Sequence, residues 1–201
     1  MSTRSGNILC LYSAIVIGAL SAEFFYKVHA PLRNTDATVL GVLYIGLLSF
    51  LLLIGKTSGE TILFGVHFQN GGLRLLQLFC CVWSVDISAY LIGKKFGRTK
   101  LCEDLSPKKT WEGSTGGFVV ATLVSIGLGA WFKFDLAQSM AIGGAIGVMS
   151  QLGDLAESAI KREFGVKDSG DIIPGHGGML DRLDSLIFAA PVFYGLLLIL
   201  Q

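Results

Sequence analysis

Six apolar stretches, each near the length that crosses a bilayer, constrain this fold more than any other feature of the sequence. About 20 consecutive apolar residues span the hydrocarbon core as a helix. Backbone groups in lipid must bond within the chain, so we expect each stretch to be helical. The predicted spans cover residues 8–25, 39–55, 72–93, 116–132, 138–156 and 185–200.

The composition agrees with a membrane protein. Apolar residues make up 52% of the 201 residues and charged residues only 15%, whereas soluble domains average about 25% charged residues. The mean hydropathy is +0.62. This composition argues against a soluble enzyme, a disordered chain and a nucleic-acid binder. We therefore predict an all-α polytopic integral membrane protein with about six transmembrane helices.

The basic residues are distributed unequally between the two faces that six spans create. One face carries only Arg4, Lys56, Arg74 and Lys133, and the other carries the remaining 12 of the 16 Lys and Arg residues. The basic face contains the loops near 26–38, 94–115 and 157–184. The positive-inside rule places that face in the cytoplasm and both termini outside.

Three acidic residues within or beside different spans reach one predicted depth near the cytoplasmic face. Asp86 lies in the third span, Asp154 ends the fifth and Asp184 opens the sixth. Charged residues within spans are costly and usually functional. Carboxylates gathered at one depth suit a hard divalent cation such as Mg²⁺. The alternative interpretation is that each acid is a helix-end residue solvated by lipid head groups.

The loop at 158–184 contains an unusual Gly-His-Gly-Gly sequence at 175–178. Successive backbone N–H groups in such a turn can cradle phosphate, and a helix beginning near Asp181 would direct its N-terminus toward that turn. The alternative is an ordinary glycine-rich turn followed by a helix capped by Asp181.

This loop resembles the signature of the phosphatidate cytidylyltransferase (CDP-diglyceride synthetase) family. The matching positions are Ser158, Ile160, Lys161, Arg162, Lys167, Asp168, Gly170, Ile173, Pro174, His176, Gly177, Gly178, Met179, Asp181, Arg182, Leu183 and Asp184. Further similar stretches occur around Asp86, at 105–117 and at 153–158, so the resemblance covers about residues 83–201. We expect residues 1–71 to form membrane helices, shortened relative to the family. Residues 72–201 would form the catalytic membrane domain with loops 94–115 and 157–184.

The resemblance implies transfer of the cytidylyl group of CTP to phosphatidic acid, giving CDP-diacylglycerol and pyrophosphate. The implied metal is Mg²⁺, with Mn²⁺ as an alternative, and whether an additional monovalent cation joins it stays open. The expected partners are CTP, phosphatidic acid, membrane lipid and a second copy of the chain as a homodimer, but no nucleic acid. The expected location is the bacterial inner membrane, with the active site facing the cytoplasm.

The resemblance and the residue pattern together assign candidate roles. We expect Asp154, Asp181 and Asp184 to hold the metal, and basic side chains to meet phosphate oxygens. His176 would orient a phosphate or the metal-bound network, with a structural role equally open. Candidate catalytic residues are Lys161, Arg162, Lys167 and His176, and candidate substrate-binding residues are Asp86, Ser106, Lys108, Lys109, Thr110 and Arg182.

Three other functions are also compatible with the sequence. A CTP-dependent lipid kinase, or a related transferase acting on a polyprenyl lipid, would share the substrate chemistry. An ion-coupled transporter would also carry intramembrane acids, although transporters commonly show inverted repeats and none is found here. A shortened, inactive paralogue with a scaffolding role is the third.

Overall fold

The computed structural model describes residues 41–57, 59–63, 66–103, 105–132, 134–166, 169, 178 and 180–200. Contacts divide the chain into two units, Met1–Ser49 and Phe50–Gln201, and the second unit carries the candidate site. The first predicted span, at 8–25, lies outside the described residues. Within the second predicted span, an apolar helix covers Gly41–Gly55, with a turn at 47–48 before α3 at Ser49–Gly55.

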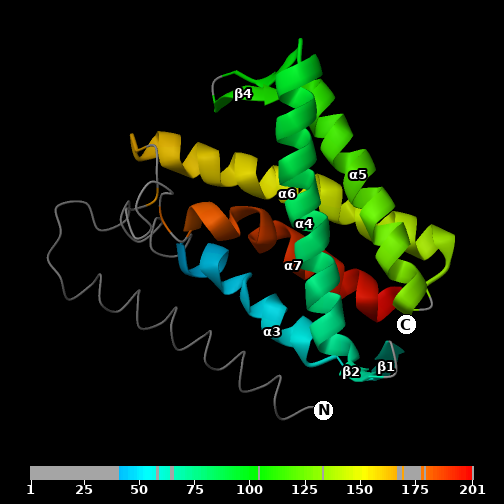
Figure 1. The fold of residues 1–201 in the computed structure, drawn as a ribbon. Coiled ribbons are helices and arrows are strands. Elements are labelled where there is room, and N and C mark those ends of the chain that lie inside the picture. The colour runs from blue at the N-terminus through cyan, green and yellow to red at the C-terminus, as the bar shows by residue number, and fades with distance from the viewer. Residues whose placement is uncertain are drawn as a thin grey trace, which may run out of the picture. The chain divides into compact units, whose positions relative to one another are not determined.

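Four longer helices cover the other predicted spans (Figure 1). They are α4 (Asn70–Phe96), α5 (Trp111–Gly129) followed by a 3-10 turn (Ala130–Phe132), α6 (Leu136–Glu163) and α7 (Leu180–Leu200). Among the described helices, three are long and apolar enough to cross a membrane: Asn70–Phe96, Trp111–Phe132 and Leu180–Leu200. The described part of the chain is thus mostly helical and contains three candidate membrane spans.

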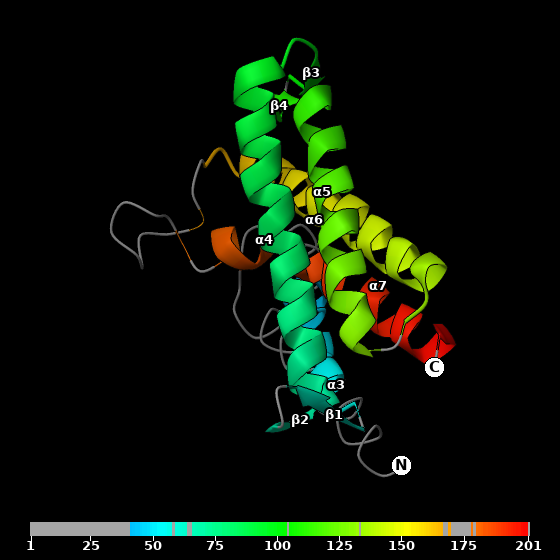
Figure 2. The ribbon, with the colours of Figure 1, turned by 45° about the vertical axis from the view of Figure 1, so that its right-hand side comes forward.

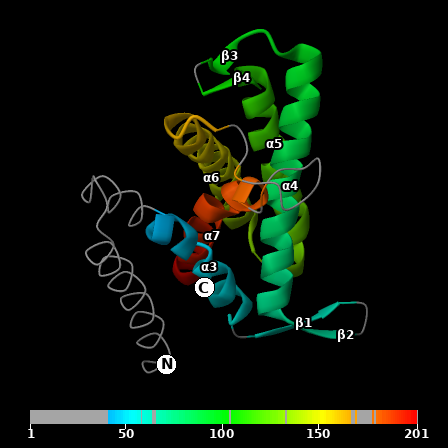
Figure 3. The ribbon, with the colours of Figure 1, turned by 90° about the vertical axis from the view of Figure 1, so that its left-hand side faces the viewer.

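Two short antiparallel hairpins interrupt the helices and modify the all-α expectation. β1 (Glu60–Leu63) pairs with β2 (Val66–Gln69), and β3 (Lys100–Cys102) pairs with β4 (Ser106–Thr110). The hairpins lie at opposite ends of α4 (Figure 3). The second hairpin falls in the loop predicted at 94–115. Pro107 favours it, because the residue before a proline is driven toward extended backbone.

Small residues let the helices approach closely. α4 and α5 lie side by side (Figure 2), and α6 packs on both α5 and α7. A methyl group added to Gly113 of α5 would lie 2.6 Å from the carbonyl oxygen of Ala89 in α4, and one added to Gly153 of α6 would lie 2.5 Å from that of Asp184. Small interface residues are typical of helix pairs packed within membranes.

Local sequence explains where α6 begins and ends. Asp135 caps its start: its carboxylate accepts a hydrogen bond from the Gln138 N–H at 2.7 Å, and the Gln138 side chain accepts one from the Asp135 N–H. This is a capping box. Gly165 ends the helix with φ of +68°, and the Val166 N–H bonds back to the Lys161 carbonyl at 2.9 Å. A glycine in this left-handed conformation is a common helix stop.

Candidate functional site

A cavity of about 810 Å³ brings together most of the residues predicted from the sequence. Its walls come from α4, α5, α6, α7 and the β3–β4 hairpin. The cavity therefore brings together segments that lie far apart in the chain. The predicted site residues among its lining are Asp86, Ser106, Lys108, Lys109, Thr110, Asp154, Lys161, Asp181, Arg182 and Asp184. Carboxylates and basic side chains therefore face one shared space.

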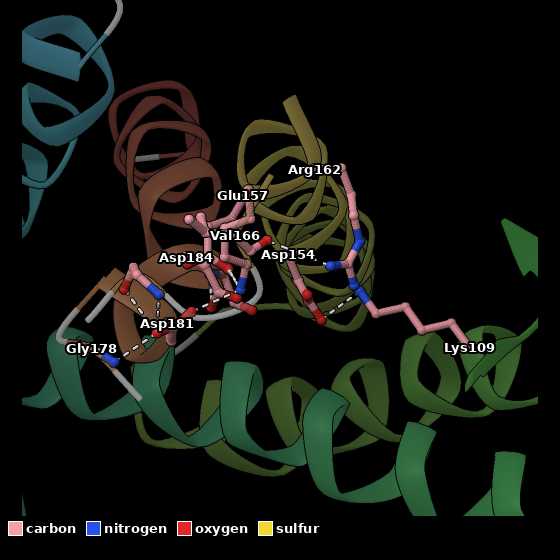
Figure 4. Close-up of polar contacts among 11 residues, drawn as sticks. Lys109, Asp154, Glu157, Arg162, Val166, Gly178, Asp181 and Asp184 are labelled. Atoms are coloured by element: carbon pink, nitrogen blue, oxygen red, sulfur yellow. Dashed lines mark hydrogen bonds and ion pairs between the residues drawn. The ribbon is translucent and has the colours of Figure 1, made fainter. Parts of the chain in front are cut away.

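A lysine of the β3–β4 hairpin forms an ion pair with an aspartate of α6. The Lys109 ammonium on β4 lies 2.5 Å from the Asp154 carboxylate, and the two side chains are 26% and 33% exposed. Figure 4 shows Lys109 extending toward Asp154. The exposed Glu112 helps to order this region, because its carboxylate accepts hydrogen bonds from the Arg98 and Thr99 N–H groups. The ion pair places a candidate substrate-binding residue directly beside a candidate metal ligand.

Lys161 joins two acidic side chains from different helices. Its ammonium lies 2.6 Å from Glu157 in α6 and 2.7 Å from Asp181 in α7. The side chains of Lys161, Glu157 and Asp181 are 18%, 1% and 12% exposed, respectively. This bridge fixes the last turns of α6 to the first turn of α7.

Burial and ion pairing shift the pKa values of Lys161 and Glu157 in opposite directions. Both residues lie in the last turns of α6. Burial favours the neutral amine, but the hydrogen bonds to Asp181 and Glu157 outweigh it and raise the pKa of Lys161. Burial raises the pKa of Glu157 to about 7, while Lys161 acts against that rise. Lys161 therefore remains protonated at neutral pH, since both partners stabilise its charge.

Asp181 also accepts hydrogen bonds from two described residues between α6 and α7. Its second carboxylate oxygen accepts hydrogen bonds from the Ser169 N–H at 2.9 Å, the Ser169 hydroxyl at 2.8 Å and the Gly178 N–H at 2.7 Å. Figure 4 shows Asp181 at the centre of these contacts. The prediction of a helix beginning near Asp181 is confirmed, because α7 begins at Leu180.

The candidate metal ligands differ in how they are engaged. Asp154 and Asp184 both line the cavity. Asp184 accepts a hydrogen bond from the Ser185 N–H, whereas both oxygens of Asp181 are already bonded. Among the described residues, no three His, Cys, Asp or Glu side chains form a ready-made metal cluster.

The remaining predicted residues lie partly in the cavity, partly away from it and partly outside the described residues. Thr110 is 8% exposed and caps α5 by accepting a hydrogen bond from the Gly113 N–H, although it also lines the cavity. Arg162 is exposed, is not among the cavity's lining residues and donates to the Val166 carbonyl. Lys167 and His176 lie outside the described residues. The roles predicted for these four residues stay predictions.

Sequence reasoning missed a contact that holds two walls of the cavity together. The Ser114 hydroxyl of α5 donates to the Gln151 side-chain oxygen of α6, and Gln151 donates back to the Ser114 carbonyl at 3.2 Å. Both residues line the cavity. The available signal was spacing, because Gln151 lies three residues before Asp154 and so shares its helix face.

The sequence of the chain is similar to those of known proteins. The sequence model of the cytidylyltransferase family matches residues 4–200. The chain is 37% identical over 211 residues to a phosphatidate cytidylyltransferase of Synechocystis sp., covering 94% of this chain and 68% of that protein.

Two other relatives match over shorter stretches. A phosphatidate cytidylyltransferase of Bacillus subtilis is 45% identical over 134 residues, covering 65% of this chain and 50% of that protein. The uncharacterized protein YnbB of Escherichia coli is 46% identical over 129 residues, covering 64% of this chain and 43% of that protein. The chain thus spans about two thirds of the first relative and half or less of these two. With its family match extending over nearly all of its length, the chain belongs to the cytidylyltransferase family.

Proposed function

We propose that this chain transfers the cytidylyl group of CTP to phosphatidic acid, giving CDP-diacylglycerol and pyrophosphate. The observation that carries the proposal is the single cavity where carboxylates of α4, α6 and α7 meet the lysines of the β3–β4 hairpin. Two relatives are named phosphatidate cytidylyltransferase, which supports this choice of nucleotide and lipid.

The chemistry requires charge neutralisation more than a protein nucleophile. An oxygen of the phosphatidate phosphate forms a bond to the α-phosphorus of CTP, and the bond from that phosphorus to the β-phosphate bridging oxygen breaks. Pyrophosphate leaves with the electron pair. Catalysis of such transfers rests on positioning and on stabilising negative charge. We propose that Lys108, Lys109 and Arg182 contact phosphate oxygens, with Ser106 as a hydrogen-bond donor and Asp86 positioning substrate.

The residues present fit a magnesium ion. Mg²⁺ in proteins is held by one or two carboxylates together with waters and substrate phosphates, so a preformed three-carboxylate cluster is not required. We propose Asp154 and Asp184 as its direct ligands, with Asp181 beside them. When bound, the ion would supply positive charge against the triphosphate.

The membrane setting of the reaction is also a proposal. The charge distribution supports six spans with the cavity at the cytoplasmic face of a bacterial inner membrane. That face would give CTP access from the cytoplasm and phosphatidic acid access from the bilayer. A homodimer stays a prediction.

Labelled nucleotide tests the proposed reaction against lipid phosphorylation. Purified protein is incubated with phosphatidic acid, Mg²⁺ and CTP labelled either in the α-phosphate or in the γ-phosphate. We expect the α-label to appear in lipid and the γ-label in pyrophosphate. Transfer of the γ-label to lipid would instead show a kinase and refute the proposal.

A further inference from the structure

The bridge Glu157–Lys161–Asp181 is a connected chain of charges that lies on one side of the proposed reaction centre. Glu157 is almost fully buried, and the two nitrogen–oxygen distances are 2.6 and 2.7 Å. Charge-assisted hydrogen bonds of this length are stronger than neutral ones. Each member therefore restricts the position of the next.

The surroundings of Lys161 make it poorly suited to hold a substrate phosphate. Its ammonium already faces two carboxyl groups, and its side chain is only 18% exposed. Two acids against one ammonium leave no surplus positive charge for an anion. Breaking a buried pair to release the lysine is costly, because it leaves uncompensated partners behind.

The chain of contacts continues from Asp181 into the backbone. One Asp181 oxygen is held by Lys161, and the other accepts hydrogen bonds from the N–H groups of Ser169 and Gly178. Gly178 is the last residue of the Gly-His-Gly-Gly sequence expected to cradle phosphate, and Ser169 precedes that sequence. The position of Asp181 thus links the end of α6 to two points of the connection into α7.

We propose that Glu157 is a positioning residue that holds Lys161 against Asp181, and that Lys161 serves this bridge instead of contacting a substrate phosphate. The bridge orients Asp181, which lines the cavity, and thereby fixes the backbone N–H groups of Ser169 and Gly178 that bond to it. Its kinetic consequence rests on the proposed function, whereas its effect on the backbone does not.

Hydrogen exchange tests the structural part of this inference directly. In Glu157→Gln, which keeps size but removes charge, we expect the amides of Ser169 and Gly178 to exchange about tenfold faster, as loss of one charged hydrogen bond implies. Peptides from α5 should be unchanged. Glu163→Gln is the matched control, because Glu163 is an exposed acid at the end of the same helix. Unchanged exchange in a folded Glu157→Gln protein would overturn the inference.

Steady-state kinetics separate positioning from substrate contact. We expect Glu157→Gln and Lys161→Met each to lower kcat about tenfold or more with little change in the KM for CTP. The kcat of the double variant should be no lower than that of Lys161→Met, because the effects of residues that act as one unit are non-additive. A selective rise in KM for Lys161→Met, with Glu157→Gln near wild type, would show phosphate contact and refute the inference. If wild type forms no CDP-diacylglycerol, the proposed function fails, and the exchange comparison still decides the positioning role.

Discussion

At the residue scale, the site depends on which acid is paired with which base. Lys109 pairs with Asp154 at the end of β4, while Lys161 is shared between Glu157 and Asp181. Both lysines line the same cavity, but Lys109 has one acidic partner and Lys161 has two. This difference makes Lys109 the better candidate for attracting a polyanionic nucleotide.

Replacing Lys109 by methionine should weaken nucleotide use. The change removes a cation beside Asp154 while keeping most of the side-chain length, and a charged hydrogen bond contributes about 1.5–3 kcal/mol. We expect kcat/KM for CTP to fall about tenfold or more in an assay of CDP-diacylglycerol formation. Lys95→Met serves as the control, because Lys95 lies over the Phe96 ring at the end of α4 and does not line the large cavity. An equal kcat/KM for CTP in Lys109→Met and Lys95→Met would contradict a role for Lys109 in nucleotide use.

Residues of the site differ in how readily the sequence predicts them. Asp86, Asp154 and Asp184 could be found because an acid in an apolar span is exceptional, and the structure brings all three to one cavity. Lys108 and Lys109 could be found through the family resemblance. The Ser114–Gln151 contact could be found only in part, because spacing places Gln151 on the helix face of Asp154 but does not identify its partner on α5.

At the element scale, close helix packing determines where the carboxylates lie. Gly153 lies against the backbone of Asp184, so α6 and α7 meet next to the two proposed metal ligands. The helices could be predicted from their apolar length. The β3–β4 hairpin could not, because hydropathy does not distinguish a polar loop from a short polar strand pair.

Substituting alanine for Gly153 should therefore disturb both stability and the site. The added methyl group would lie 2.5 Å from the Asp184 carbonyl oxygen, so α6 and α7 must separate. Overpacking of this kind costs about 1–3 kcal/mol, which thermal unfolding in detergent can measure. Gly127→Ala is a matched control in α5, because a methyl group there has nothing within 4 Å. A Gly153→Ala protein as stable as the Gly127→Ala protein would contradict the packing argument.

At the scale of the whole molecule, orientation in the membrane decides which substrate reaches the cavity. Three described helices are long and apolar enough to cross a bilayer, and the sequence predicts six spans. The orientation in the membrane can be predicted from the sequence only through the distribution of Lys and Arg residues. That distribution acts while the chain inserts into the membrane, so it is not seen as a contact in the folded protein.

Reporter fusions test this orientation. A reporter placed after Gln201 should be active outside the cytoplasm, and the same reporter inserted at Glu103, between β3 and β4, should be active inside. The reason is that the hairpin belongs to the basic face and the C-terminus to the opposite one. A cytoplasmic signal after Gln201 would contradict six spans.

The most direct test of the central claim is CDP-diacylglycerol formation by wild type and by Asp184→Asn, with Mg²⁺ and with EDTA. Asn keeps the shape of the side chain but lacks the charge that a divalent ion needs. We expect wild type to be active only with Mg²⁺, and folded Asp184→Asn to be inactive in both conditions. Turnover by wild type in EDTA, or wild-type rates for Asp184→Asn, would contradict a metal-assisted cytidylyl transfer in this cavity.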